Sequence, residues 1–117
     1  MANIKILTNC QQIDIISFMR IISKKTIKDF YEQNLYQDSK ESLEALHKET
    51  LKANWKNPND IKEQYRNSSI VGNNRVVFNI YGNKYRLIVQ INYFAQVVYI
   101  RFIGTHKQYD KIDAMQI

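Results

Sequence analysis

The pattern of apolar and polar residues divides this 117-residue chain into a helical first half and a β second half. Between Ile27 and Trp55, apolar residues recur every three or four positions, as in an amphipathic helix. From Ser69 onward the period is two, as in half-buried strands. Because the helices precede the strands rather than alternate with them, the pattern predicts an α+β fold. N-terminal helices are expected to pack on one face of a small antiparallel β-sheet.

Two main helices are predicted in the first half. The second follows Asp38, which precedes Glu41 by three residues as in a capping box, and continues to about Trp55. Pro58 ends it, and one further short turn of helix is expected after this proline. Residues 19–22 are expected to form a short strand. The first helix is defined by an apolar stripe of Ile27, Phe30, Tyr31 and Leu35.

Three strands are predicted in the second half: Arg75–Ile80, Tyr85–Tyr93 and Gln96–Ile103. The connection "YGNK" and a tight turn at Phe94–Ala95 join them, so we expect an antiparallel meander. Because neighbouring strand residues point to opposite faces, each strand divides into two sets. The set expected to be buried by the helices is Val76, Phe78, Ile80, Tyr85, Leu87, Val89, Ile91, Val98, Ile100 and Phe102.

The opposite face, called the outer face below, contains all three arginines of these strands. The chain has 17 Lys and Arg against 11 Asp and Glu, yet no acid lies between Gln64 and Tyr109. An arginine in an apolar strand is normally paired with a carboxylate or turned to water. A solvated sheet surface is one interpretation, and an anionic ligand, above all nucleic acid, is the other. The outer face comprises Arg75, Val77, Asn79, Arg86, Ile88, Gln90, Val97, Tyr99, Arg101 and Ile103.

A second group of polar residues follows the third strand, where "GTHKQYDK" supplies His106, Lys107, Tyr109 and Lys111. Cleavage of an RNA phosphodiester requires a base for the 2′-OH proton, an acid for the leaving 5′-oxygen and cations for the developing charge. The sequence offers these groups without a carboxylate cluster for a two-metal nuclease or a Cys/His set for zinc. Neither a metal nor a cofactor is therefore predicted, and metal-independent RNA contact is favoured.

Composition places the chain among cytoplasmic proteins without a membrane segment. Cys10 is the only cysteine, which precludes an intramolecular disulfide, and no stretch approaches roughly 20 apolar residues. The apolar start is interrupted by Asp14 and lacks a small-residue cleavage site, so a signal peptide is not expected. Residues 1–18 are predicted to be an N-terminal extension outside a single domain at 19–117.

Residues 19–114 resemble the HigB family of toxins in the RelE/ParE superfamily. The likeness is carried by "MRIIS" at Met19, by "ANWKNP" at Ala53–Pro58 and by residues 71–113, most specifically "GNKYRL" and "RFIGTHKQYDKID". The resemblance implies a RelE-like toxin fold and a type II toxin that cleaves mRNA on the ribosome. It also implies a HigA-like helix-turn-helix antitoxin. A non-catalytic ParE-like inhibitor of DNA gyrase is the alternative.

The resemblance also assigns candidate site residues. Arg86 matches the arginine that the superfamily holds at the scissile phosphate, His106 a basic residue after the last strand, and Tyr109 the C-terminal catalytic tyrosine. Two lysines of RelE proper correspond to Val77 and Asn79, so proton-transfer roles cannot be copied from that protein. The predicted catalytic set is Arg86, His106, Tyr109 and Lys111. The predicted RNA-binding set is Arg75, Asn79, Lys84, Gln90, Tyr99, Arg101 and Lys107.

Overall fold

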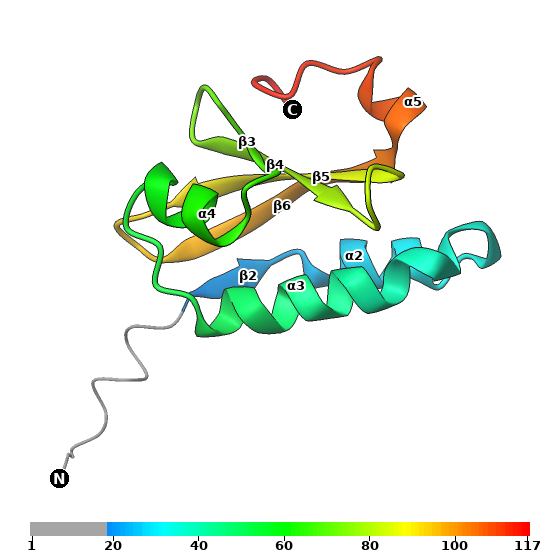
Figure 1. Ribbon diagram of the computed structural model, residues 1–117, viewed down its shortest axis with the longest axis horizontal. Helices are drawn as coiled ribbons and strands as arrows, with labels where there is room; N and C mark the ends of the chain where they lie inside the picture. The colour runs from blue at the N-terminus through cyan, green and yellow to red at the C-terminus, as the bar shows by residue number, and fades with distance from the viewer. Residues whose placement is uncertain (1–18) are drawn as a thin grey trace, which may run out of the picture.

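The protein is described by a computed structural model that covers residues 19–117. The expected extension at residues 1–18 lies outside the described residues. A mixed five-stranded sheet has the order β2-β6-β5-β4-β3 (Figure 1). Its strands are β2 (Arg20–Ile22), β3 (Ser69–Val71), β4 (Arg75–Ile80), β5 (Tyr85–Asn92) and β6 (Val97–Thr105). Strand β2 runs parallel to β6, whereas β3, β4, β5 and β6 pair antiparallel.

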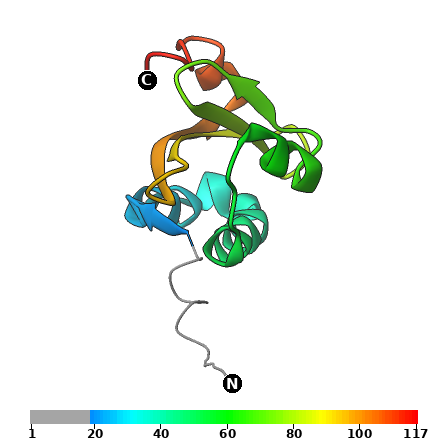
Figure 2. The ribbon, with the colours of Figure 1, turned by 90° about the vertical axis from the view of Figure 1, so that its left-hand side faces the viewer.

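The helices lie on both sides of this sheet (Figures 1 and 2). Helices α2 (Lys24–Tyr31) and α3 (Lys40–Lys52) cover one face, joined by the 3-10 helix η1 (Asn34–Ser39). Helix α4 (Pro58–Gln64) precedes β3, and the single turn α5 (His106–Tyr109) follows β6 on the opposite side. The predicted α+β class, the three-strand meander and the turn of helix after Pro58 are confirmed. No helix within residues 19–117 is both long and apolar enough to cross a membrane.

The core lies between the sheet and helices α2 and α3. Leu43, Trp55, Phe78 and Leu87 are among its buried members. At one end of the core, Phe30 stacks on Tyr36 with ring centroids 4.4 Å apart, and Tyr85 meets Phe30 edge to face at 5.3 Å. Aromatic pairs of these geometries stabilise a fold beyond the area that they bury. The start of β5, which carries Arg86, is thus fixed to the helical layer through its neighbour Tyr85.

Two details of the helical prediction are wrong. Leu35 does not belong to a buried stripe, because it lies in η1 and is 80% exposed. The expected capping box at Asp38 does not form, since Ser39 is the N-cap residue of α3 and its side chain accepts no hydrogen bond from the first turn. The Asp38 carboxylate instead accepts hydrogen bonds from Lys84 Nζ and Tyr85 Oη, both at 2.5 Å. A contact with β5 has replaced the local contact that the spacing suggested.

A β-bulge changes the alternation in β6. Val89 pairs with Ile100 but Ile88 pairs with Phe102, so Arg101 has no partner residue on β5. Beyond this point the faces are exchanged: Phe102 lies beside Ile88 on the outer face, and Ile103 packs against the core. The predicted placements of Phe102 and Ile103 are therefore wrong.

The outer face is only partly open. Val77, Ile88 and Val97 on this face are 2%, 0% and 3% exposed. The chain after α5 passes over the β3 and β4 side of the sheet (Figure 1). It is held there by hydrogen bonds from Asn73 Nδ2 to the Met115 carbonyl and from Arg75 to the main-chain oxygen of Ile117.

Candidate active site

Arg86 lies near the start of β5, between Asn79 of β4 and Gly104 of β6. Its guanidinium is half-buried, and Nη1 donates hydrogen bonds to the carbonyls of Asn83 at 2.8 Å and Tyr85 at 3.4 Å. Within residues 19–117 its Nε and Nη2 donate none, so these groups remain available to a ligand. An arginine carries five N–H donors in a planar fork that suits phosphate oxygens.

Gly104, which lies opposite Arg86 on β6, contributes no side chain of its own and so leaves room for those of its neighbours. A Cβ at this position would lie 2.5 Å from Gln108 Oε1 and 2.6 Å from Phe102 Cζ, closer than non-bonded atoms approach. Phe102 and Gln108 occupy that space, which allows α5 to fold back toward the sheet. A glycine is thus needed at position 104 because α5 approaches the strand closely, and not because the backbone adopts an unusual angle.

Helix α5 is short but firmly capped. Thr105 Oγ1 accepts a hydrogen bond from Gln108 N at 3.2 Å, and Gln108 Oε1 accepts one from Thr105 N at 2.9 Å. This reciprocal capping box satisfies two amide groups that a helix start otherwise leaves unpaired. The cap places the Tyr109 ring with its centroid 5.8 Å from Arg86 Cζ. The helix is absent from the sequence prediction, although Thr105 and Gln108 have the spacing that indicates it.

The remaining predicted catalytic residues lie at the start of α5 and just beyond its end. His106 begins α5 and is exposed, with Nδ1 3.8 Å from Asp110 Oδ2. That separation is too long for a direct hydrogen bond and fits an electrostatic contact when the imidazole is protonated. Lys111 is also exposed, as is Lys107 of the predicted RNA-binding set. The sequence prediction did not include Asp110 among the site residues. Its i, i+4 spacing from His106 is the sequence feature that indicates this contact.

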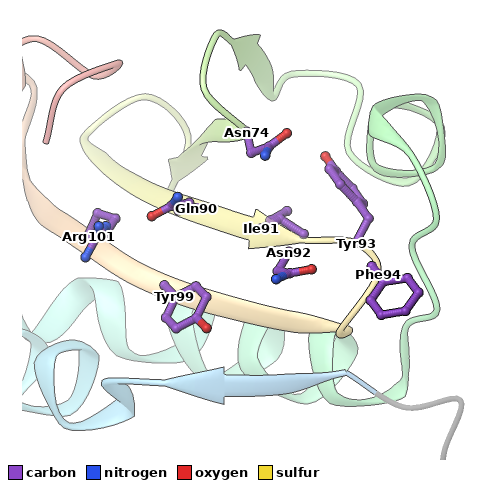
Figure 3. Close-up of a pocket in the computed structure, with 8 residues that line it drawn as sticks. All are labelled: Asn74, Gln90, Ile91, Asn92, Tyr93, Phe94, Tyr99 and Arg101. Atoms are coloured by element: carbon purple, nitrogen blue, oxygen red, sulfur yellow. The ribbon is translucent and has the colours of Figure 1, made fainter.

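The other six predicted RNA-binding residues divide into three groups. Asn79 lies beside Arg86 in the sheet, and its Nδ2 donates to the Asn67 carbonyl at 2.9 Å. Further along the outer face, Gln90, Tyr99 and Arg101 line a common cavity (Figure 3). The third group consists of two cations that other protein groups engage.

These two cations are Arg75 and Lys84. Arg75 is 8% exposed, and it donates to the main-chain oxygen of Ile117 at 2.7 and 3.2 Å and to the Asn73 carbonyl at 2.8 Å. Lys84 lies beside the helical layer, ion-paired with Asp38. The hydrogen bond with Asp38 raises the pKa of Lys84, and the same bond lowers the pKa of Asp38. The structure therefore brings neither cation to the free surface beside Arg86.

The site is rich in basic groups, and the carboxylate that contacts them is Asp110, beside His106. In the part of the chain that the structure describes, no three His, Cys, Asp or Glu side chains form a group that could hold a metal. Arg86 can bind and stabilise an anion beside Tyr109, while His106 on the same helical turn can exchange a proton and Lys111 adds a cation. A phosphodiester is the anion that uses all of these groups together.

Comparison with known proteins places this geometry in a family. Residues 39–112 match the HigB toxin family, described as the RelE-like toxic component of a toxin-antitoxin system. The mRNA interferase toxin HigB of Escherichia coli K12 is 31% identical over 99 residues, which cover 83% of this chain and 93% of the relative. The mRNA interferase HigB proteins of Escherichia coli O157:H7 and Shigella flexneri match equally well. The matched regions include β4, β5, β6 and α5, and the chain therefore belongs to the HigB toxin family.

Proposed function

We propose that this toxin is an endoribonuclease that cleaves mRNA on the translating ribosome and so inhibits translation. The observation that supports this function best is the pair of Arg86 and Tyr109 on a sheet face without acidic residues, with exposed basic groups beside it. The naming of the relatives as mRNA interferases points to the same activity. Inhibition of DNA gyrase is not favoured, because it leaves this arrangement without a purpose.

In the proposed reaction the free Nε and Nη2 of Arg86 bind the scissile phosphate. The 2′-oxygen of the upstream ribose attacks phosphorus while a base removes its proton. The bond to the 5′-oxygen then breaks as an acid supplies a proton, which leaves a 2′,3′-cyclic phosphate and a 5′-hydroxyl. Charge on the pentavalent intermediate is offset by Arg86, a contribution typically worth about 10²–10³ in rate.

Proton transfer falls to the groups of α5 and the residue beyond its end. His106 is the candidate base or acid, because an imidazole can both accept and donate a proton. The Tyr109 ring lies within cation-π distance of the guanidinium, which favours this orientation of Arg86 and brings a phenol near the bound phosphate. Lys111 follows within two residues and adds a cation. The proposed reaction assigns no step to a metal ion.

The partners follow from this assignment. As a member of a toxin-antitoxin family the protein has an antitoxin. We propose that this antitoxin is a HigA-like helix-turn-helix protein and that the toxin acts in the cytoplasm, where ribosomes carry its substrate. An adjacent reading frame that encodes such a protein would support the first proposal.

The chemistry of the cut ends tests the proposal directly. Expression of the toxin should arrest translation and cut mRNA within reading frames, and the products should carry 2′,3′-cyclic phosphate and 5′-hydroxyl ends. Magnesium removal is unsuitable as a test, because it also dissociates ribosomes. Products with 3′-hydroxyl and 5′-phosphate ends would exclude the proposed reaction, and inhibited gyrase with intact mRNA would exclude RNA cleavage altogether.

A further inference from the structure

A cavity of about 610 Å³ opens on the outer face at the end of β5 away from Arg86 (Figure 3). Its volume lies within the range of pockets that hold small ligands. Gln90 of β5 and Tyr99 of β6 are direct neighbours in the sheet and form part of its lining. Gln90 is four residues from Arg86, which corresponds to about 13 Å along a strand. The cavity is therefore separate from the proposed cleavage centre.

The polar groups of the cavity are largely uncommitted. Among residues 19–117, the side chains of Gln90, Tyr99 and Arg101 form no hydrogen bonds with one another or with other groups. Asn92 uses only its Oδ1, which accepts from Ala95 N at 2.9 Å. Amide side chains offer a donor and an acceptor side by side, the combination that pairs with the edge of a nucleobase. Arg101, freed from strand pairing by the bulge, adds a cation.

An exposed aromatic ring lies next to these polar groups. Phe94 occupies the turn between β5 and β6, lines the cavity and is 100% exposed. A phenylalanine without any covering side chain leaves its apolar surface in water, whereas bases of single-stranded nucleic acid stack readily on such rings. Tyr99 offers a second ring, half-buried on the floor (Figure 3).

We propose that this cavity binds the base of one nucleotide of the same RNA strand, at a fixed distance from the scissile phosphate. The proposal rests on the proposed function and adds a base-selecting contact to it. Gln90 and Asn92 contact the base edge, Phe94 stacks on it, and Arg101 binds its phosphate. A strand that follows β5 from Arg86 reaches the cavity without crossing the C-terminal segment, which lies over β3 and β4 (Figure 1).

The first test compares cleavage patterns. Positions of cuts in mRNA on ribosomes are mapped for the wild type, Gln90→Ala and Phe94→Ala, with Gln37→Ala and Leu35→Ala as matched controls on η1. We expect the wild type to prefer certain bases at one offset from the cut. Gln90→Ala should weaken that preference roughly 5- to 100-fold. Phe94→Ala should raise KM by a similar factor at all sites, and the controls should change neither quantity.

The second test measures base binding without cleavage. The side-chain amide resonances of Gln90 and Asn92 are followed by NMR while adenosine, guanosine, cytidine or uridine 5′-monophosphate, or inorganic phosphate, is added. Shifts that depend on the base and are absent with phosphate support the proposal. Shifts with phosphate alone, or no base-dependent shift, overturn it and leave the cavity as a backbone contact or an empty groove.

The outcomes separate this proposal from the proposed function. A wild type that cuts no RNA refutes the function, whereas cutting with an unchanged base preference in Gln90→Ala refutes only the cavity proposal. Uniform loss of cleavage at all sequences in a folded Gln90→Ala protein also refutes base selection. Weakened antitoxin binding with an unaltered cleavage pattern would assign the cavity to a protein partner instead.

Discussion

At the scale of single residues, Arg86 separates chemistry from folding. Its neighbours Tyr85 and Leu87 are each 1% exposed and point into the core, whereas Arg86 points to the outer face. The Arg86 side chain makes few contacts within residues 19–117. Its Nη1 donates to two main-chain carbonyls, and the Tyr109 ring lies within cation-π distance of it. Such a residue can be removed without opening a cavity.

Arg86→Ala should therefore abolish most activity and leave the fold intact. Loss of a group that stabilises transition-state charge costs about 10²–10³ in rate. Loss of the exposed cation-π contact should cost only about 0.5–1 kcal/mol of stability. The melting temperature and the single-turnover cleavage rate are measured for each variant, with Lys48→Ala on α3 as the control for lost charge. A rate equal to wild type would show that Arg86 is not at the reacting phosphate.

Leu87→Ala should show the opposite behaviour. Truncation of this fully buried side chain removes apolar contacts and leaves a cavity, which typically costs about 2–5 kcal/mol. The denaturant midpoint should fall strongly, while cleavage per folded molecule stays near the wild-type value. If Leu87→Ala keeps its stability, the core as described around β5 is wrong.

At the scale of elements, the cap of α5 links the strand to the site. Thr105 ends β6 and is the N-cap residue of α5, so its hydroxyl holds the turn that carries both His106 and Tyr109. A helix of one turn has little stability of its own, because nucleation costs more than its few hydrogen bonds return. The position of Tyr109 over Arg86 therefore depends on this cap and on the close approach at Gly104.

Thr105→Val should weaken activity more than it weakens the fold. The substitution keeps the branched shape and removes the hydroxyl acceptor, and loss of an N-cap costs about 0.5–2 kcal/mol. Hydrogen exchange at the Gln108 and Tyr109 amides should become faster, and kcat should fall while β4 and β5 keep their protection. Unchanged exchange at these amides would indicate that the cap does not hold α5.

The contact between η1 and β5 gives a pH-dependent prediction. The hydrogen bond from Lys84, and next the one from Tyr85, lowers the pKa of Asp38 below its ordinary value of 3.8. A carboxyl whose pKa is lower in the folded than in the unfolded state stabilises fully above the unfolded value, and less as pH falls through the folded one. At high pH the contribution persists until Lys84, whose pKa is raised above 10.5, loses its proton.

Asp38→Asn should thus lower the melting temperature at pH 7, and the difference from wild type should shrink as pH falls below about 4. Thermal unfolding of both proteins between pH 3 and pH 9 provides the measurement. Lys25, which pairs with Asp29 on exposed α2, offers a control: Asp29→Asn should change stability little. A difference between Asp38→Asn and wild type that stays constant down to pH 3 would contradict the contact.

Periodicity predicted these elements well where neighbours in sequence decide the structure. The bounds of β4 and the turn of helix after Pro58 follow from alternation and from proline. Periodicity did not predict the contact of Asp38 or the bulge at Arg101. The contact of Asp38 with Lys84 spans 46 residues, and the bulge at Arg101 depends on pairing with β5, so neither has a local signal. For the site, residue types and family likeness indicated Arg86 and Tyr109. That the two side chains lie close together could be learned only from the structure.

At the scale of the whole molecule, acidic and basic residues are concentrated in different parts of the fold. Eight of the ten acidic residues within residues 19–117 lie between Lys24 and Gln64, the segment that contains α2, η1, α3 and α4, whereas the outer face beside β5 and β6 carries cations. Arg75 does not contribute to that surface, because it secures the C-terminal segment over β3 and β4. The predicted contact of Arg75 with RNA stays a prediction.

A protein that begins at Met19 should fold and cut RNA like the full chain. Met19 is 2% exposed and belongs to the core, and β2 starts at the next residue, so we predict that the domain begins here. The melting temperature and cleavage rate of residues 19–117 are compared with those of residues 1–117. A shortened protein that is insoluble or inactive would show that residues 1–18 contribute to the domain.

The bulge at Arg101 also bears on how such toxins can diverge. Because Arg101 has no partner on β5, its deletion would leave every pairing of β6 in place, including Gly104 opposite Arg86. Chain length can therefore vary at this point without disturbing the catalytic end of the strand. A relative that lacks this residue should therefore keep the same strand pairing. Under the cavity proposal, the same deletion should change which base the toxin prefers.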